Sequence, residues 1–252
     1  MPWQDQQREK TLTWLLEPDN PGVRYLAMRD ILKLPGNDAD LIASQELAHR
    51  EGPLAVILEA MNEAGYWVEA GPGHYPKYRG SVWSLITLAQ LGASPALDKR
   101  VRQACDYLLE HALTVNGQFT VSGAPSGTAD CLQGNLCDAM IDLGINDTRL
   151  ETAFEWMARS VTGEGVAPLE DKQAQLRYYA GNCGPVFACG SNNKYPCAWG
   201  GVKVMLAFSK LPPERRTPII QRAIQQGVDF LFSVDPATAS YPTGWSDKPS
   251  KN

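Results

Sequence analysis

Hydrophobic residues recur at intervals of three and four along most of the chain, and this spacing predicts α-helices. Proline and glycine stand between the helical segments, so each predicted helix has a defined end. The predicted helices cover residues 9–17, 23–34, 38–50, 53–64, 79–92, 98–112, 130–144, 147–161, 197–211 and 215–232. Strand-like sequence is confined to 119–121, which is short. The sequence therefore predicts an all-α fold.

From residue 79 onward the helices form pairs, and the second helix of each pair carries a common block. Its last five residues are small, apolar, acidic, aromatic and aliphatic in turn, at 103–108, 152–157 and 226–231. The copies begin 49 and 74 residues apart, so the third follows about 25 extra residues, which we place in an inserted loop at 163–196. Repeats built from one helix pair bury their core by stacking on one another.

The block also predicts where large side chains are buried. Tyr107, Trp156 and Phe230 occupy its aromatic position and are expected to pack between neighbouring helices. Turns that contain glycine follow the second helices, at Gly117 and Gly165. Gly65 and the Gly244-Trp245 pair stand at similar places near the two ends of the repeat region.

The first helices of two pairs begin with the same motif. Cys131-x-x-Gly134 opens one of these helices, and Cys197-x-x-Gly200 opens another. Because the repeats stack, equivalent ends of the first helices should face one place. We expect this place to be the mouth of a central cavity.

The aromatic block, the Leu-Gly helix endings and the Gly-aromatic turns resemble the prenyltransferase and squalene-cyclase repeat. The chain looks most like small bacterial squalene-cyclase-like members of this terpenoid cyclase family. The resemblance implies an α/α toroid, in which inner helices line a central cavity that takes an isoprenoid or other apolar ligand. Only four to five hairpins are recognisable in residues 1–252, which we interpret as one domain. We therefore expect a partial toroid that lacks its last hairpin or is closed by a partner or a second copy.

The catalytic motifs of the family are missing from this sequence. It contains neither the Asp-x-Asp-Asp of one cyclase class nor the Asp-Asp-x-x-Asp of the other. The nearest match, Asp38-Ala39-Asp40, stands where a helix begins and is interpreted as an N-cap. Prenyltransferases hold zinc with an Asp-x-Cys pair, whereas Asp130 and Cys131 are adjacent here. Thioester proteins of the same fold use Cys-x-Glu-Gln, which is also absent.

Four cysteines at or between the mouths of the inner helices form the candidate metal site. They are Cys131, Cys183, Cys189 and Cys197. Four thiolates suit zinc or an iron–sulfur cluster, although the spacing lacks the Cys-x-x-Cys pairs of standard zinc ribbons. A redox disulfide and buried, unreacted thiols are the alternatives.

The candidate catalytic residue is Asp130, interpreted either as an acid at the cavity or as the N-cap of the helix that begins with Cys131. Seven further residues on or before the inner helices are candidate ligand-binding positions. They are His74, Tyr78, Arg79, Trp83, Asn135, Trp199 and Lys203. Of these, Trp83 and Trp199 offer aromatic faces that attract cations, or else simply pack against neighbouring helices.

Composition excludes several classes of partner. A net charge of −5 and a pI near 5.3 argue against nucleic-acid binding, which needs a basic surface. No apolar run reaches the roughly 20 residues of a transmembrane helix. The first residues lack the pattern of a signal peptide, so we expect a cytoplasmic protein whose six cysteines are thiols.

Three functions remain as hypotheses. The first is a cyclase-like or prenyltransferase-like toroid that binds an isoprenoid. The second is a non-catalytic interaction scaffold, which the missing acidic motifs favour. The third is a carbohydrate-active α/α barrel, and it ranks last because such enzymes need paired carboxylates across a cleft.

Overall fold

The computed structural model describes residues 2–168, 170–174 and 181–244 of the chain. In these ranges the chain forms ten α-helices, short 3₁₀ and π turns, and isolated bridges in place of strands, which confirms the all-α prediction. The helices are α1 (Pro2–Leu15), α2 (Pro21–Leu26), α3 (Ala39–Ala48), α4 (Pro53–Glu59), α5 (Ser81–Gln90), α6 (Lys99–His111), α7 (Asp130–Asp142), α8 (Thr148–Thr162), α9 (Ala198–Ser209) and α10 (Pro218–Leu231). The predicted turn at Gly244-Trp245 lies partly outside the described residues.

Polar side chains set several helix starts. Asn20 accepts a hydrogen bond from the Val23 amide at 3.4 Å and so caps α2, while a π turn over Ala27–Ile31 prolongs that helix. Asp38 accepts from the amides of Asp40 and Leu41, both at 3.0 Å. Asp38 is thus a helix cap, as the sequence predicts.

Two successive second helices begin in the same way, which supports the repeat of 49 residues. Asp98 accepts from the Arg100 amide at 2.9 Å and pairs with the Arg100 guanidinium at 2.6 Å. Asp147 accepts from the Arg149 amide at 2.8 Å and pairs with the Arg149 guanidinium at 2.7 Å. The same cap therefore opens α6 and α8.

The glycine turns repeat as well. Gly65 packs against the carbonyl oxygen of Gln103 on α6, and Gly117 packs against that of Thr152 on α8. Gln103 and Thr152 occupy the same position of the repeated block. In these two repeats the turn that ends one hairpin docks on an equivalent site of the following second helix.

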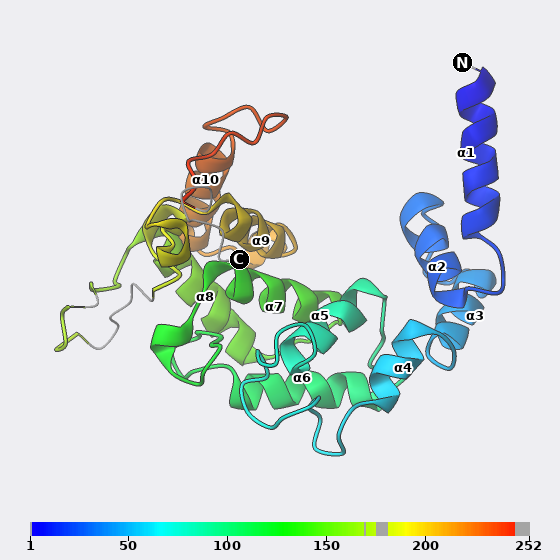
Figure 1. Ribbon diagram of the computed structural model, residues 1–252, viewed down its shortest axis with the longest axis horizontal. Coiled ribbons are helices and arrows are strands. Elements are labelled where there is room, and N and C mark those ends of the chain that lie inside the picture. The colour runs from blue at the N-terminus through cyan, green and yellow to red at the C-terminus, as the bar shows by residue number, and fades with distance from the viewer. Residues whose placement is uncertain (1, 169, 175–180, 245–252) are drawn as a thin grey trace, which may run out of the picture.

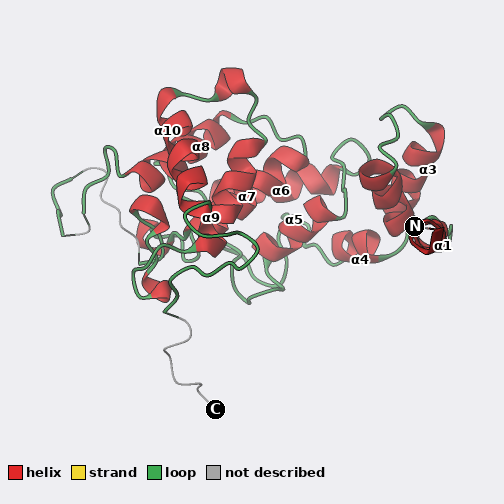
Figure 2. Cartoon of the chain, turned by 90° about the horizontal axis from the view of Figure 1, so that it is seen from above, coloured by secondary structure: helices red, strands yellow, loops and turns green. Residues whose placement is uncertain are grey.

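The helix pairs are arranged in two rows. One row contains α5, α7 and α9, with α7 packed against both neighbours, and the other contains α6, α8 and α10, with α8 packed against α10 (Figure 2). Figure 1 shows a U-shaped outline, in which α1 to α3 form one limb and α9 and α10 lie near the other. The ring does not close among the described residues, so the toroid remains a prediction.

Hydrophobic side chains form one large core and two small ones. The large core extends from Leu54 on α4 to Ala223 on α10. A separate core in the N-terminal limb contains Tyr25, Met28 and Leu41. The N-terminal limb, residues 8–48, therefore has packing of its own.

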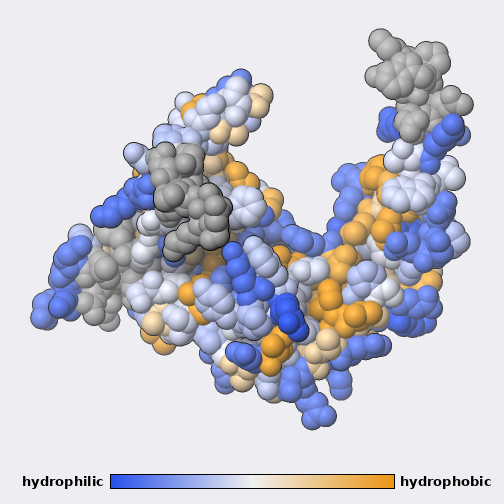
Figure 3. All heavy atoms as spheres, in the orientation of Figure 1, coloured by the Kyte–Doolittle hydropathy of each residue, from blue (hydrophilic) through white to orange (hydrophobic). Residues whose placement is uncertain are grey.

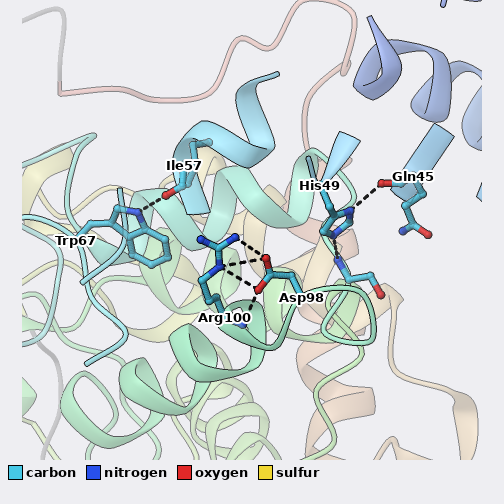
Figure 4. Close-up of polar contacts among 7 residues, drawn as sticks. Gln45, His49, Ile57, Trp67, Asp98 and Arg100 are labelled. Carbon is cyan, nitrogen blue, oxygen red and sulfur yellow. Dashed lines mark hydrogen bonds and ion pairs between the residues drawn. The ribbon is translucent and has the colours of Figure 1, made fainter. Parts of the chain in front are cut away.

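Polar contacts join this limb to the first hairpin (Figure 4). The buried His49 ring donates from Nδ1 to the Gln45 carbonyl oxygen at 2.8 Å and accepts at Nε2 from the Ser94 amide at 2.9 Å. The Gln45 amide donates to the Gly92 carbonyl oxygen at 3.0 Å, and Gly92 packs against Tyr25. The joint thus depends on Gln45 of α3, on His49 at the C-cap of that helix, and on the loop after α5.

Glycines of the Cys-x-x-Gly motif allow α7 and α9 to touch along their backbones. A Cβ at Gly134 would lie 2.5 Å from the carbonyl carbon of Lys203 and 2.6 Å from the Val204 nitrogen. A Cβ at Gly200 would lie 3.1 Å from the Cβ of Asp130. Each motif glycine therefore leaves room for the other helix.

The aromatic positions of the block follow the sequence prediction at two of three sites. Tyr107 on α6 and Trp156 on α8 are buried, whereas Phe230 on α10 is only partly buried. Phe230 lies against the rings of Phe187 and Tyr241 near the end of the array. No further hairpin packs on it among the described residues, so its burial was overestimated.

Candidate functional site

The first turns of α5, α7 and α9 lie at one end of the array, as the repeat predicts. The loop before α5 meets the loop before α7, where Gly123 faces Pro72. The segment that contains Asn182 pairs with Ala129 just before α7, and the Asp130 amide donates to the Asn182 carbonyl oxygen at 3.3 Å. The inserted loop therefore crosses the mouth of the inner helices.

A short antiparallel turn brings Cys189 to Cys197. The Cys197 amide donates to the Phe187 carbonyl oxygen at 2.9 Å, and the Cys189 amide donates to the Tyr195 carbonyl oxygen at 3.2 Å. Ala188 and Pro196 form the bridge between these bonds. Because side chains alternate along an extended segment, Cys189 and Cys197 lie on the same side of this turn.

The two thiols affect each other's pKa. Cys197 is the N-cap of α9, where the Cys189 thiol and then the amides of Gly200 and Trp199 stabilise its thiolate and lower its pKa. The pKa of Cys189 is raised, because its proton is engaged with Cys197 and because the residue is buried. One thiolate, on Cys197, and one thiol, on Cys189, are therefore the favoured state of the pair.

Asp130 is buried beside this pair, and its carboxyl is not the helix cap. Ala129 takes the N-cap position of α7, and the Asp130 side chain points inward, with 3% of the residue exposed. Burial raises the pKa of Asp130 well above its usual range, and nearby Cys189 adds to the shift. The amide of Gly184 and the hydroxyl of Ser160 lower it only in part, since neither makes a hydrogen bond of normal geometry. The N-cap interpretation was wrong, and the buried surroundings of Asp130 favour its neutral form.

A neutral buried acid has a measurable effect on stability. Near pH 4 the unfolded chain releases the Asp130 proton while the native protein keeps it, so wild-type stability falls as pH rises towards the native pKa. Asp130→Asn removes this penalty. We expect the variant to gain stability over the wild type by roughly 1.4 kcal/mol for each pH unit above 4, until the native pKa is reached. Urea unfolding between pH 4 and pH 7 measures the difference.

Asp147 provides a control with the opposite sign. The Arg149 guanidinium beside it lowers the pKa of Asp147 to about 2. Its contribution is present above pH 4 and lost as pH falls towards that value, so Asp147→Asn should lose stability relative to the wild type as pH rises. A pH-independent difference for Asp130→Asn would show that Asp130 is not neutral in the native state.

The structure does not gather the four predicted metal ligands into one group. Cys183 packs with Trp156 and Val166 in a small core of its own. Among the described residues, no group of three or more His, Cys, Asp or Glu side chains is arranged to hold a metal ion. All six cysteines lie in the described ranges and none is in a disulfide. A zinc or iron–sulfur centre therefore stays a prediction that this geometry does not support.

The predicted ligand-binding residues fall into two groups. Before α5, His74 and Tyr78 stack on Trp83, with ring centroids 5.2 and 4.9 Å from the indole. The Trp83 nitrogen donates to the His74 carbonyl oxygen at 2.9 Å. Burial and then Lys77 lower the pKa of His74, which favours its neutral form.

On α9 the ammonium of Lys203 lies 5.3 Å from the centre of the Trp199 ring. Trp199 is 68% exposed, and Val202 and Leu206 are 50% and 43% exposed on the same helix. Spacings of three and four residues place these apolar side chains in one stripe. The α9 stripe (Trp199, Val202 and Leu206) is uncovered among the described residues.

Two predicted residues belong to neither group in the described part of the chain. Arg79 is exposed two residues before α5, and Asn135 is half-buried on α7 one turn after Cys131. Sequence reasoning missed Val202 and Leu206, although their spacing from Trp199 is readable in the sequence. It also treated Cys189 as one of four ligands, whereas the structure pairs it with Cys197.

Comparison with known proteins finds no match among family models, curated proteins or solved structures. The resemblance to squalene-cyclase repeats therefore remains a prediction. In the part of the chain that the structure describes, no helix has both the length and the hydrophobicity needed to cross a bilayer.

Proposed function

We propose that the protein binds an apolar small molecule of the isoprenoid class on the row of α5, α7 and α9, in a cytoplasmic setting. The observation that supports this best is the α9 stripe. Exposed aromatic and aliphatic side chains at three- and four-residue spacing usually face a core or a ligand rather than water. The absence of disulfides among the six cysteines, all of which lie in the described ranges, agrees with a reducing compartment.

The surroundings of the stripe fit a ligand with an apolar body and a polar end. Lys203 extends over the Trp199 ring and presents its ammonium beside the apolar surface. Figure 3 shows a wide hollow between the N-terminal limb and the α9–α10 end, with hydrophobic residues on both flanks.

Substitution of one stripe residue tests the proposal. Val202→Asp places a carboxylate on the stripe. An apolar ligand would have to bury this charge without offering it a partner, so the ligand should bind more weakly. With farnesol as the probe, we expect affinity to fall by about tenfold or more, a change of about 1.4 kcal/mol. Equilibrium dialysis with labelled farnesol measures this affinity.

Val228 on α10 provides the matched control, since it is 40% exposed and lies on the other row. Val228→Asp should leave farnesol binding unchanged, and circular dichroism should show both variants folded. Equal loss in both variants, or no binding to the wild type, would reject an isoprenoid ligand on α9.

The interaction scaffold is a second candidate, favoured by the same exposed stripe. A second copy or a helix of a partner would then cover Trp199, Val202 and Leu206. Sedimentation distinguishes this from ligand binding, because self-association of the wild type should disappear in Val202→Asp.

The carbohydrate-active enzyme has weaker support. Such an enzyme needs two carboxylates that face each other across a cleft. Asp138 and Asp142 instead lie together on α7, and both pair with Lys210, at 2.6 and 2.5 Å.

A further inference from the structure

We propose that Cys189 and Cys197 form a redox-active dithiol that exchanges with low-molecular-weight disulfides, with Cys197 as the attacking sulfur. The proposal concerns the mouth of α7 and α9 and does not depend on the apolar ligand. It rests on the placement of the two sulfurs, on the groups that stabilise one of them as a thiolate, and on the burial of other cysteines.

Backbone geometry holds the pair together. The bonds from Cys197 to Phe187 and from Cys189 to Tyr195 fix two extended segments side by side. Asn193 and Lys194 turn the chain between them in the left-handed region, with φ of 53° and 64°. The Cys189 carbonyl oxygen also accepts from the Lys194 amide at 2.9 Å, which closes the turn. The turn thus places both thiols on one side of the chain without a change of fold.

The surroundings distinguish Cys197 from the other thiols. It stands at the N-cap of α9, where the start of the helix favours negative charge on its sulfur. Cys197 is half-buried and so reachable from solvent, whereas Cys105, Cys137 and Cys183 are buried in apolar surroundings. Cys131 is also half-buried at a helix start, but burial and then Asp130 raise its pKa. Cys197 is therefore expected to be the strongest nucleophile among these thiols.

The exchange proceeds in two steps with a small disulfide as the oxidant. The Cys197 thiolate attacks one sulfur of the disulfide, which forms a mixed disulfide and releases the other half as a thiolate. The Cys189 proton passes to that thiolate. Cys189 then attacks Cys197, forms the intramolecular bond and releases the second half as a thiolate. The protein loses two electrons, and one small disulfide becomes two thiols once the second thiolate takes a proton from water.

Glutathione disulfide and the purified full chain test this directly. After the reduced protein is treated with the probe, we expect a Cys189–Cys197 disulfide by peptide mass spectrometry and two glutathiones released per chain. Cys189→Ser should stop at a stable glutathione adduct on Cys197, because the second step is lost. Cys197→Ser should slow the consumption of the probe by at least tenfold.

Cys131→Ser is the matched control, since Cys131 lies at the same mouth and should not contribute. Its rate should equal that of the wild type, and circular dichroism should show all variants folded. The proposal is overturned if the wild type keeps its thiols reduced, or if the adduct forms on Cys131. Stoichiometric zinc in protein purified without chelators, lost in Cys197→Ser, would instead identify the pair as metal ligands.

Discussion

Gly134→Ala is expected to destabilise the protein by about 3 kcal/mol or more, because overpacking at a backbone contact has no flexible neighbour to absorb it. The added Cβ would lie 2.5 Å from the Lys203 carbonyl carbon. A backbone atom in the middle of α9 cannot move aside alone, so α7 and α9 must separate. Separation opens gaps around Leu136 and Val204, which belong to the large core. Urea unfolding of the purified variant measures the loss.

Two other glycines provide graded controls for this prediction. At Gly200 the added Cβ would meet the Cβ of Asp130 at 3.1 Å, so a smaller loss is expected. At Gly22 on α2 no atom lies within 4 Å, and alanine should leave stability unchanged or slightly higher. If Gly134→Ala proved as stable as Gly22→Ala, the close contact of α7 and α9 would be disproved.

Trp156→Ala is expected to lower the free energy of unfolding by about 3–5 kcal/mol, as large aromatic deletions in cores do. Trp156 is only 1% exposed and is among the largest fully buried side chains. It packs with Val166 and Cys183, so it holds the inserted loop against α8. Differential scanning calorimetry should show the loss as a lower melting temperature.

The matched substitution for this prediction is Trp14→Ala on α1. Trp14 is 65% exposed, so its removal should change stability by less than about 0.5 kcal/mol. Hydrogen exchange adds a second test, because loss of Trp156 should also expose the amides of the Cys189–Cys197 turn. If both tryptophan variants lost the same stability, Trp156 would not anchor the loop.

Local signals explain why most helices were predictable. Proline, glycine and capping side chains act on their own neighbours, so Asp38 and Asp98 mark the starts of α3 and α6 from sequence alone. The predicted bounds of a helix differ from the observed bounds where the backbone is not in a helical conformation. Gly80 has a ψ of 173°, an extended conformation that a helix does not allow, so α5 begins at Ser81 rather than at Arg79.

The site was less predictable, because it depends on how three distant segments meet. Spacing could place Cys131, Cys189 and Cys197 at one mouth, but it could not show that a backbone turn sets Cys189 and Cys197 on the same side of the chain. The direction of the Asp130 side chain depends on its packing beside Gly200 on α9, which no local pattern reports. Ring closure also depends on elements beyond any one repeat, so the sequence could suggest a toroid without establishing one.

The separate core of the N-terminal limb has a consequence for cooperativity. Tyr25, Met28 and Leu41 pack apart from the large core, and Gln45 and His49 make the polar joint. A unit of this kind can open sub-globally, at a free energy below that of complete unfolding. Because the limb is one side of the U, each opening changes the width of the hollow in front of α9. The opening of the N-terminal limb, far from Cys197, would then control how easily a ligand reaches the row of α5, α7 and α9.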